Sequence, residues 1–259
     1  MNDATEVPIR PASSVVLARD TDSGISAGIS AGIELFMLER TSAAVFAGGM
    51  HVFPGGRVDE ADHDPEYQQF AVGPDLAQRA QVAAVGENAL GFWIAAIREC
   101  FEEAGFLLAY DAEGRMLELA DEVTVARFVA HRAALNDGTL TMLQMCRMEQ
   151  LKLAIDHLHY YHTWITPPGR PRRFNTRFFL ASVPATQEGI HDNMETVSSH
   201  WITPADALAR HADGKFGLMP VTKTQLQAFA VARDSNALVD MARTAKQFPV
   251  YRPMVPTDN

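Results

Sequence analysis

One stretch of sequence decides the fold, and it reads Arg98-Glu99-Cys100-Phe101-Glu102-Glu103-Ala104-Gly105-Phe106. At 100° per residue, its three glutamates fall within an arc of about 100° on a helix that begins near Asn88. Apolar residues fall on the opposite side, namely Leu90, Trp93, Ile94, Ile97, Phe101 and Ala104. The pattern predicts a helix that buries one face, presents three carboxylates on the other, and ends at Gly105.

The acidic face of this helix has two interpretations. Three like charges on one face repel by about 0.2–0.5 kcal/mol per neighbouring pair, and a divalent cation would turn that repulsion into binding. Solvated helices also carry glutamate-rich faces, so the stretch alone leaves both interpretations open. A second motif, Pro54-Gly55-Gly56, allows a turn with positive φ and close backbone approach.

Length and composition limit the class of protein. The chain has 259 residues, 47% of them hydrophobic, and a formal net charge of −10. That charge argues against binding to nucleic-acid backbones, and no run of 18 apolar residues is present to span a membrane. We expect no secretory signal, because the residues up to Pro11 lack a basic start followed by an apolar run, and residues 256–259 do not match a peroxisomal tripeptide. Cys100 and Cys146 lie in predicted helices, so we expect a cytoplasmic protein with reduced thiols.

Along the chain, periodicity predicts strands and helices in a mixed order. Strands are expected at 13–18, 33–38, 51–53, 160–165, 174–183 and 197–202. Helices are expected at 65–70, 74–85, 88–104, 121–135, 142–152, 204–211, 222–233 and 236–246. Residues 1–10 are predicted to be a flexible tail, and 23–32 a flexible hairpin loop. Because no linker divides the rest, residues 11–259 are predicted to form one α+β domain.

The two motifs together resemble the Nudix hydrolases, whose signature is G-x5-E-x7-R-E-U-x-E-E-x-G-U with U apolar. Gly56 matches the first glycine, and the stretch from Arg98 to Phe106 matches the end. Asp62 stands where the first glutamate is expected, but 35 residues separate it from Arg98 instead of seven. Whether Asp62 still reaches the site is therefore left open.

An insertion within this signature is similar to that of the peroxisomal coenzyme A diphosphatase-like subgroup of the family. The resemblance implies a Nudix α/β/α sandwich with a mixed sheet, plus extra helices from the insertion (63–87) and the C-terminal region (213–259). Two roles are open for the insertion: it covers the active site, or it builds the contact of a homodimer.

The resemblance also implies the parts of a metal-dependent site for Mg²⁺ or Mn²⁺. Glu102 and Glu103 would be direct ligands together with the Gly55 carbonyl, and Glu99 would be a ligand or orient the attacking water. Arg98 would hold Glu99 and Glu103 by ion pairing. A general base outside the motif is expected among later carboxylates, with Glu195 preferred and with Asp192 and Glu188 as alternatives.

The implied substrate is a small nucleotide derivative with a diphosphate linkage. Coenzyme A or acyl-coenzyme A, cut to 4′-phosphopantetheine and adenosine 3′,5′-bisphosphate, is preferred. The alternatives are NADH, ADP-ribose or a nucleotide sugar, or a nucleotide-sensing module without hydrolysis. Arginines suit phosphates, and the candidates for substrate contact are Arg40, Arg57, Arg173 and Arg177, with Arg170 and Arg172 in the same basic cluster.

Aromatic and histidine groups near this cluster carry weaker signals. Trp164, Phe174 and Phe179 could stack on a base, although core packing is favoured. The histidines at 157, 159 and 162 lack a cysteine or acidic partner at ligand spacing, which disfavours a zinc site.

Overall fold

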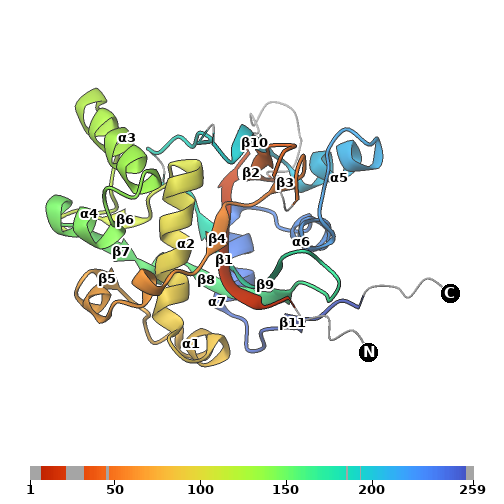
Figure 1. Cartoon of the computed structure of the whole chain (residues 1–259), viewed down its shortest axis with the longest axis horizontal. Helices are drawn as coiled ribbons and strands as arrows, with labels where there is room; N and C mark the ends of the chain where they lie inside the picture. The colour runs from red at the N-terminus through yellow and green to blue at the C-terminus, as the bar shows by residue number, and fades with distance from the viewer. Residues whose placement is uncertain (1–6, 22–31, 45–46, 185, 193, 255–259) are drawn as a thin grey trace.

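The structure is a computed structural model that describes residues 7–21, 32–44, 47–184, 186–192 and 194–254 (Figure 1). Its centre is a mixed sheet in the order β10-β2-β1-β9-β8-β11, with β3 paired to β2 and β4 paired to β1. These strands are β1 (Ile9–Asp20), β2 (Ile33–Arg40), β3 (His51–Val52), β4 (Gly55–Arg57), β8 (His159–Ile165), β9 (Arg173–Ser182), β10 (Thr196–Ile202) and β11 (Val250–Tyr251). The β1–β9 and β8–β11 pairs are parallel and the other pairs are antiparallel, so the mixed sheet and the central place of β9 are confirmed.

Helices cover both faces of this sheet. The helix α2 (Ala89–Ala104) lies across one face, and α5 (Pro204–Ala212), α6 (Pro220–Phe229) and α7 (Ser235–Arg243) lie on the other (Figure 1). The alternation of β2 separates the two cores, because Phe36 and Leu38 pack with α2 whereas Leu35 and Met37 pack with the opposite helices. The predicted α/β/α sandwich is confirmed.

A second, smaller sheet lies beside α2, in the order β5-β7-β6. It is built from β5 (Ala71–Val72), β6 (Ala109–Tyr110) and β7 (Lys152–Ala154), and it is flanked by α3 (Glu122–Asn136) and α4 (Met142–Glu149). The short helical turns of the chain are η1 (Glu60–His63), η2 (Pro65–Gln69) and η3 (Ile155–His157), and the insertion adds α1 (Arg79–Val85). The larger addition to the sandwich is therefore residues 107–158, which lie after the signature and not inside it.

The insertion is anchored to the core by two buried glutamines. Gln78 donates from Nε2 to the carbonyls of Ile155 and Leu158, both at 2.8 Å. Gln81 accepts from the Tyr160 amide at 2.7 Å. These contacts lie where β8 begins, next to the first half of α2, whereas the glutamates lie on its last turns. Most of the insertion therefore braces the helix and does not cover the site.

The ends of the first strand change one predicted boundary. Ile9 and Arg10 already pair with Arg173 and Phe174 of β9, so these two residues are not part of a flexible tail. Residues 1–6, which complete that tail, and 22–31, most of the predicted hairpin loop, lie outside the described residues. The loop's ends are joined by a hydrogen bond from the Thr21 amide to the Gly32 carbonyl at 2.9 Å.

In the part of the chain that the structure describes, no single helix is long and apolar enough to cross a membrane. The pair α1 and α2 meets the length and composition only together, with a bend of 94° between them.

We predict that Gln78→Ala lowers the free energy of unfolding by about 1–3 kcal/mol, because the Ile155 and Leu158 carbonyls each lose one of their two hydrogen-bond donors and a buried side chain is removed. Urea unfolding followed by circular dichroism measures this. Gln68→Ala is the matched control, since Gln68 lies in the same insertion but is exposed. Equal stability of the two variants would contradict the anchoring role.

Candidate active site

The last turns of α2 carry the three glutamates into a cleft and not into bulk solvent. The helix ends as predicted at Gly105, which has φ +78°. The side chains of Glu99, Glu102 and Glu103 are 14%, 17% and 8% exposed. A solvated acidic face would be far more exposed, so that interpretation of the stretch is wrong.

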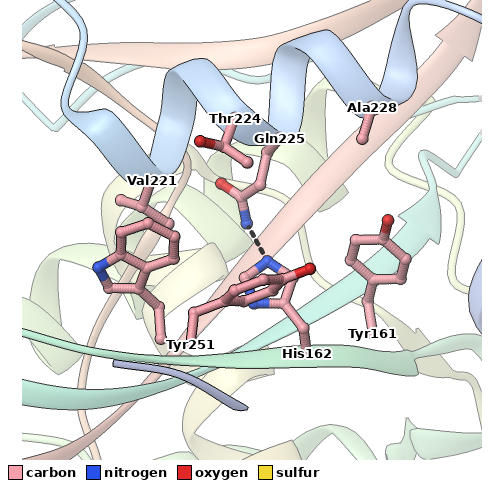
Figure 2. A pocket seen from close by; sticks show the side chains of 8 residues that line it. Tyr161, His162, Val221, Thr224, Gln225, Ala228 and Tyr251 are labelled. Atoms are coloured by element: carbon pink, nitrogen blue, oxygen red, sulfur yellow. Dashed lines mark hydrogen bonds between the residues drawn. The ribbon is translucent and has the colours of Figure 1, made fainter. Parts of the chain in front are cut away.

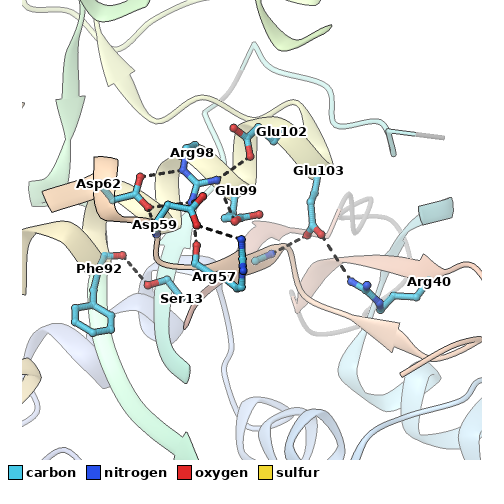
Figure 3. A network of polar contacts seen from close by, with 11 residues as sticks. Ser13, Arg40, Arg57, Asp59, Asp62, Phe92, Arg98, Glu99, Glu102 and Glu103 are labelled. Carbon is cyan, nitrogen blue, oxygen red and sulfur yellow. Dashed lines mark hydrogen bonds and ion pairs between the residues drawn. The ribbon is translucent and has the colours of Figure 1, made fainter. Parts of the chain in front are cut away.

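Arg98 sits at the centre of the polar network of this cleft (Figure 3). An arginine side chain has five N–H donors, and here all five are used. Nε and Nη2 donate to the two oxygens of Asp62, both at 2.9 Å, and Nη2 also donates to the Arg57 carbonyl at 2.9 Å. Nη1 donates to Glu99 at 3.0 Å and to Glu102 at 2.9 Å. The prediction that Arg98 pairs with Glu103 is wrong, because Glu102, four residues on, is the neighbour on the same helix face.

Asp62 reaches the site despite the insertion, which settles the question left open by the sequence. Its side chain is 2% exposed, pairs with Arg98, and accepts the Asp59 amide at 2.8 Å. The chain leaves after Asp62 and returns to α2, so that the extra residues form a separate excursion. Asp59 was not predicted. Its spacing of three residues before an acid, just ahead of a helical turn, is the signal that could have indicated it.

Glu103 is held by a different set of groups. Its Oε2 accepts the Gly55 amide at 2.8 Å, and its Oε1 lies 3.8 Å from Nη1 of Arg40. Nη2 of Arg40 donates to Glu195 at 2.9 Å, which places Glu195 on the rim of the same cleft. Arg40 thus joins a carboxylate of the helix to one of the later acids considered as a general base.

The other two later acids have different surroundings. Asp192 accepts from the amides of Met194, Glu195 and Thr196, so its carboxylate shapes the turn that leads into β10. These hydrogen bonds lower the pKa of Asp192 against the opposing effect of burial. Glu188 is exposed and does not line the cleft. Of the three candidates, Glu195 has the position best suited to a general base.

The glycine turn is packed so closely that side chains are excluded from it. A Cβ atom added to Gly55 would lie 2.3 Å from the Ser13 carbonyl oxygen. One added to Gly56 would lie 2.5 Å from every atom of the Glu99 carboxylate. The turn therefore brings backbone against α2 at the point where the carboxylates gather. The Gly55 amide contacts Glu103, and its carbonyl as a metal ligand stays a prediction.

Burial in this cleft changes the acidity of all three glutamates. Burial raises the pKa of Glu99 to about 7, although the Arg98 charge opposes the rise. Burial also raises the pKa of Glu102, and it raises that of Glu103 well above the usual range, with a further contribution from Glu99. The nearby arginines thus compensate these carboxylates only in part, as expected at a site for an additional cation. The donor set, carboxylates beside a glycine turn, fits Mg²⁺ or Mn²⁺.

The cleft beside the carboxylates has a volume of about 1450 Å³. Arg40 and Arg57 line it, as do Arg170 and Arg172 on the turn between β8 and β9. Trp164 and Phe174 also line it, and Trp164 packs against the core as well, whereas Phe179 is fully buried in the core.

Two of the predicted phosphate-binding arginines face away from the cleft. Residues 174, 176 and 178 of β9 line it, so the alternation of the strand directs Arg173 and Arg177 to the other face. Arg173 is 6% exposed and donates to the Thr166 carbonyl at 3.2 Å. The Arg177 guanidinium lies 4.1 Å from the centre of the Phe92 ring. Their assignment to substrate binding is therefore wrong.

The three histidines at 157, 159 and 162 lie on two different elements, since His157 ends η3 and the other two belong to β8. His162 points toward α6, where its Nε2 lies 2.8 Å from Nε2 of Gln225 (Figure 2). Its ring stacks on Phe178, and burial lowers the pKa of His162 to about 4. The pocket beside it measures only about 30 Å³, which is too small for a nucleotide. These contacts describe a packed core histidine.

Comparisons with known proteins agree with this geometry. A family model described as the NUDT19 Nudix domain matches residues 9–228. The chain is 30% identical over 223 residues to the acyl-coenzyme A diphosphatase NUDT19 of Gallus gallus, an alignment that covers 72% of this chain and 58% of the relative. It is 27% identical over 221 residues to the Homo sapiens protein of the same name, covering 73% and 58%. The chain thus spans well under two thirds of these relatives' length.

Solved structures include a similar fold over nearly the whole chain. The crystal structure of a Nudix hydrolase from Alicyclobacillus acidocaldarius superposes with a TM-score of 0.74 at 26% identity. The superposition covers 91% of this chain and 96% of that one, so most of this chain has a counterpart in that structure.

We predict that the metal-free protein loses stability between pH 5 and pH 7.5 relative to its Glu99→Gln variant. The raised pKa of Glu99 means that the folded state holds more protons than the unfolded state in this window. Stability from this group is therefore present below its ordinary pKa of 4.5 and is lost as the pH rises through about 7. Thermal unfolding in EDTA measures the difference, and parallel curves for the two proteins would contradict the shift. Added Mg²⁺ should stabilise the wild type more at pH 7.5 than at pH 5.

Proposed function

The chain belongs to the Nudix hydrolases, in the family of the NUDT19 Nudix domain, and from this premise we propose that it hydrolyses a diphosphate linkage with the help of a divalent metal ion. The observation that carries the proposal is the set of buried glutamates on α2, which open onto a large cleft. Arg98 holds Glu99 and Glu102, and the Gly55 amide holds Glu103. A diphosphate is dense in negative charge, so a site of acidic residues can bind it only through a cation.

The charged residues around the Gly55–Gly56 turn have separate proposed parts in this reaction. Glu102 and Glu103, with the Gly55 carbonyl, would hold Mg²⁺ or Mn²⁺, which supplies charge neutralisation of the phosphates. Glu99 would complete this ligand set or orient water, and Arg98 fixes its position. Glu195, held 2.9 Å from Arg40, is the proposed general base that takes a proton from the attacking water.

The reaction itself consumes one water molecule. Its oxygen bonds to one phosphorus of the diphosphate, the bridging P–O bond breaks, and the bridging oxygen leaves with the other phosphate. For coenzyme A the products are 4′-phosphopantetheine and adenosine 3′,5′-bisphosphate. No oxidant or reductant is needed.

Coenzyme A or an acyl-coenzyme A is the proposed substrate class. The similarity to relatives named acyl-coenzyme A diphosphatases supports this choice. Arg170, Arg172, Trp164 and Phe174 all line the cleft, and guanidinium and aromatic groups together suit an adenosine with an additional phosphate. Arg40 remains a candidate for the diphosphate, since its Nε is buried and has no hydrogen-bond partner among the described residues.

We predict that the purified protein with Mg²⁺ or Mn²⁺ hydrolyses coenzyme A faster than NADH, ADP-ribose or capped RNA. Mass spectrometry of the products would identify the bond that is cut. Faster turnover of any of the other three substrates would contradict the preference while leaving the hydrolase proposal intact.

The glutamate set supplies the matched variants for this experiment. Glu102→Gln should lose at least about a hundredfold in rate with its fold retained, because one metal ligand is neutralised. Glu87→Gln is the control, as Glu87 is exposed just before α2. An unchanged rate in Glu102→Gln would contradict its assignment as a metal ligand. Nucleotide binding without any turnover in the wild type would favour the alternative of a nucleotide-sensing module.

A further inference from the structure

A second group of ligand-type side chains lies on the other face of the sheet from the glutamates of α2. The strands β3, β2 and β10 are neighbours in the sheet (Figure 1). His51 of β3 pairs with Glu39 of β2, and Glu39 pairs in turn with Ser198 of β10. Directly paired residues share a face of the sheet, as do residues two apart, so His200 joins the same group.

This face is turned away from the glutamates of α2. In β2, Arg40 points toward Glu103 of α2, and its neighbour Glu39 must point the opposite way. Met37, two residues before Glu39, packs in the core formed with α5, α6 and α7. The sheet therefore lies between the group of Glu39, His51 and His200, hereafter the β-face triad, and the glutamates of α2.

The ligand atoms of the β-face triad are already close together. One atom from each residue lies within 4.8 Å of the others, and Nε2 of His51 is 4.0 Å from Oε2 of Glu39. Nε2 of His200 is 3.0 Å from Oγ of Ser198, which donates to Oε2 of Glu39 at 2.7 Å. Tetrahedral zinc keeps its ligand atoms about 3.3–3.6 Å apart. Side-chain rotations that move the ligand atoms of the triad by about 1 Å would therefore complete the site.

The surroundings of His51 fix its ring in an orientation suited to a ligand. Its Nδ1 lies 3.3 Å from the Gly217 carbonyl, and since a carbonyl can only accept, Nδ1 carries the hydrogen. The lone pair then belongs to Nε2, which faces Glu39. The ring also stacks on Phe216 with 3.4 Å between centroids. Metal-binding histidines are commonly oriented by such a hydrogen bond to a backbone carbonyl.

The chemistry of the β-face triad selects the kind of metal. Two imidazoles and one carboxylate suit Zn²⁺ and its analogue Co²⁺ better than Mg²⁺, which prefers oxygen ligands. Burial lowers the pKa of both histidines, which favours the neutral ligating form. The Glu39 side chain is 37% exposed, so an ion and a water as fourth ligand have access. The positive charge of Arg210 acts on both imidazoles, and it opposes the binding of a cation between them.

We propose that Glu39, His51 and His200 form a zinc-binding site that fastens β3 and β10 to β2. Such a clamp would be structural, because it joins three strands on the face turned away from the carboxylates. It would also steady β3, which leads directly into the glycine turn. The proposal does not depend on the proposed diphosphatase activity, since Glu39, His51 and His200 do not line the cleft.

The test uses Co²⁺ and Zn²⁺ as probes, with Mg²⁺ in excess to occupy the carboxylate cleft. We expect one Co²⁺ per chain with the visible absorption bands of four- or five-coordinate cobalt, and displacement of this ion by Zn²⁺. Zn²⁺ should also raise the thermal unfolding temperature. His200→Gln and Glu39→Gln should bind at least about tenfold more weakly and lose the thermal shift, since Gln preserves hydrogen bonding but is a poor ligand.

His191→Gln is the matched control, because His191 lies near β10 with its Nδ1 3.4 Å from Ser199 and is not part of the triad. It should bind Co²⁺ as the wild type does, as should Glu102→Gln. Circular dichroism confirms folding of each variant. Unchanged Co²⁺ binding in both His200→Gln and Glu39→Gln, or its loss in Glu102→Gln, would overturn the proposal.

Discussion

Arg98 donates five hydrogen bonds, and the arrangement of the cleft depends on them. Two go to Asp62 and one to the Arg57 carbonyl, which ties α2 to the segment after the glycine turn. The other two hold Glu99 and Glu102. Buried like charges repel strongly in a medium of low polarity, and this guanidinium offsets part of the repulsion within the acidic face. The position of Glu99 also requires glycine at residue 56, because a Cβ atom there would clash with the Glu99 carboxylate.

The fold was predictable where a local pattern carried enough information. The amphipathic helix with its glycine stop and the alternating strands appear close to their predicted bounds, because periodicity and capping act over a few residues. The predicted extent of the flexible tail was wrong at Ile9 and Arg10. These residues form a strand because they pair with β9, more than 160 positions away. The short strands β5 and β7 of the second sheet were missed for the same reason, since their burial is set by distant segments.

The site was predictable in its residue types and less so in its pairings. The motif gave the glutamates and Arg98, but one turn of helix geometry made Glu102 the partner of Arg98 in place of Glu103. Arg177 was misplaced because the face of a strand depends on its register, which a single sequence does not give. The β-face triad left no local signal at all, as His51 and His200 meet only through the pairing of three strands.

The central claim is that Arg98 acts by holding carboxylates in position, and Mn²⁺ affinity tests it most directly. Removing a positive charge beside a cation site should tighten binding if charge alone matters. We predict instead that Arg98→Gln, confirmed as folded by circular dichroism, binds Mn²⁺ at least about tenfold more weakly in a titration followed by electron paramagnetic resonance. Arg147→Gln, which removes an exposed charge paired with Glu66, should bind as the wild type does. Equal or tighter binding by a folded Arg98→Gln variant would contradict the account.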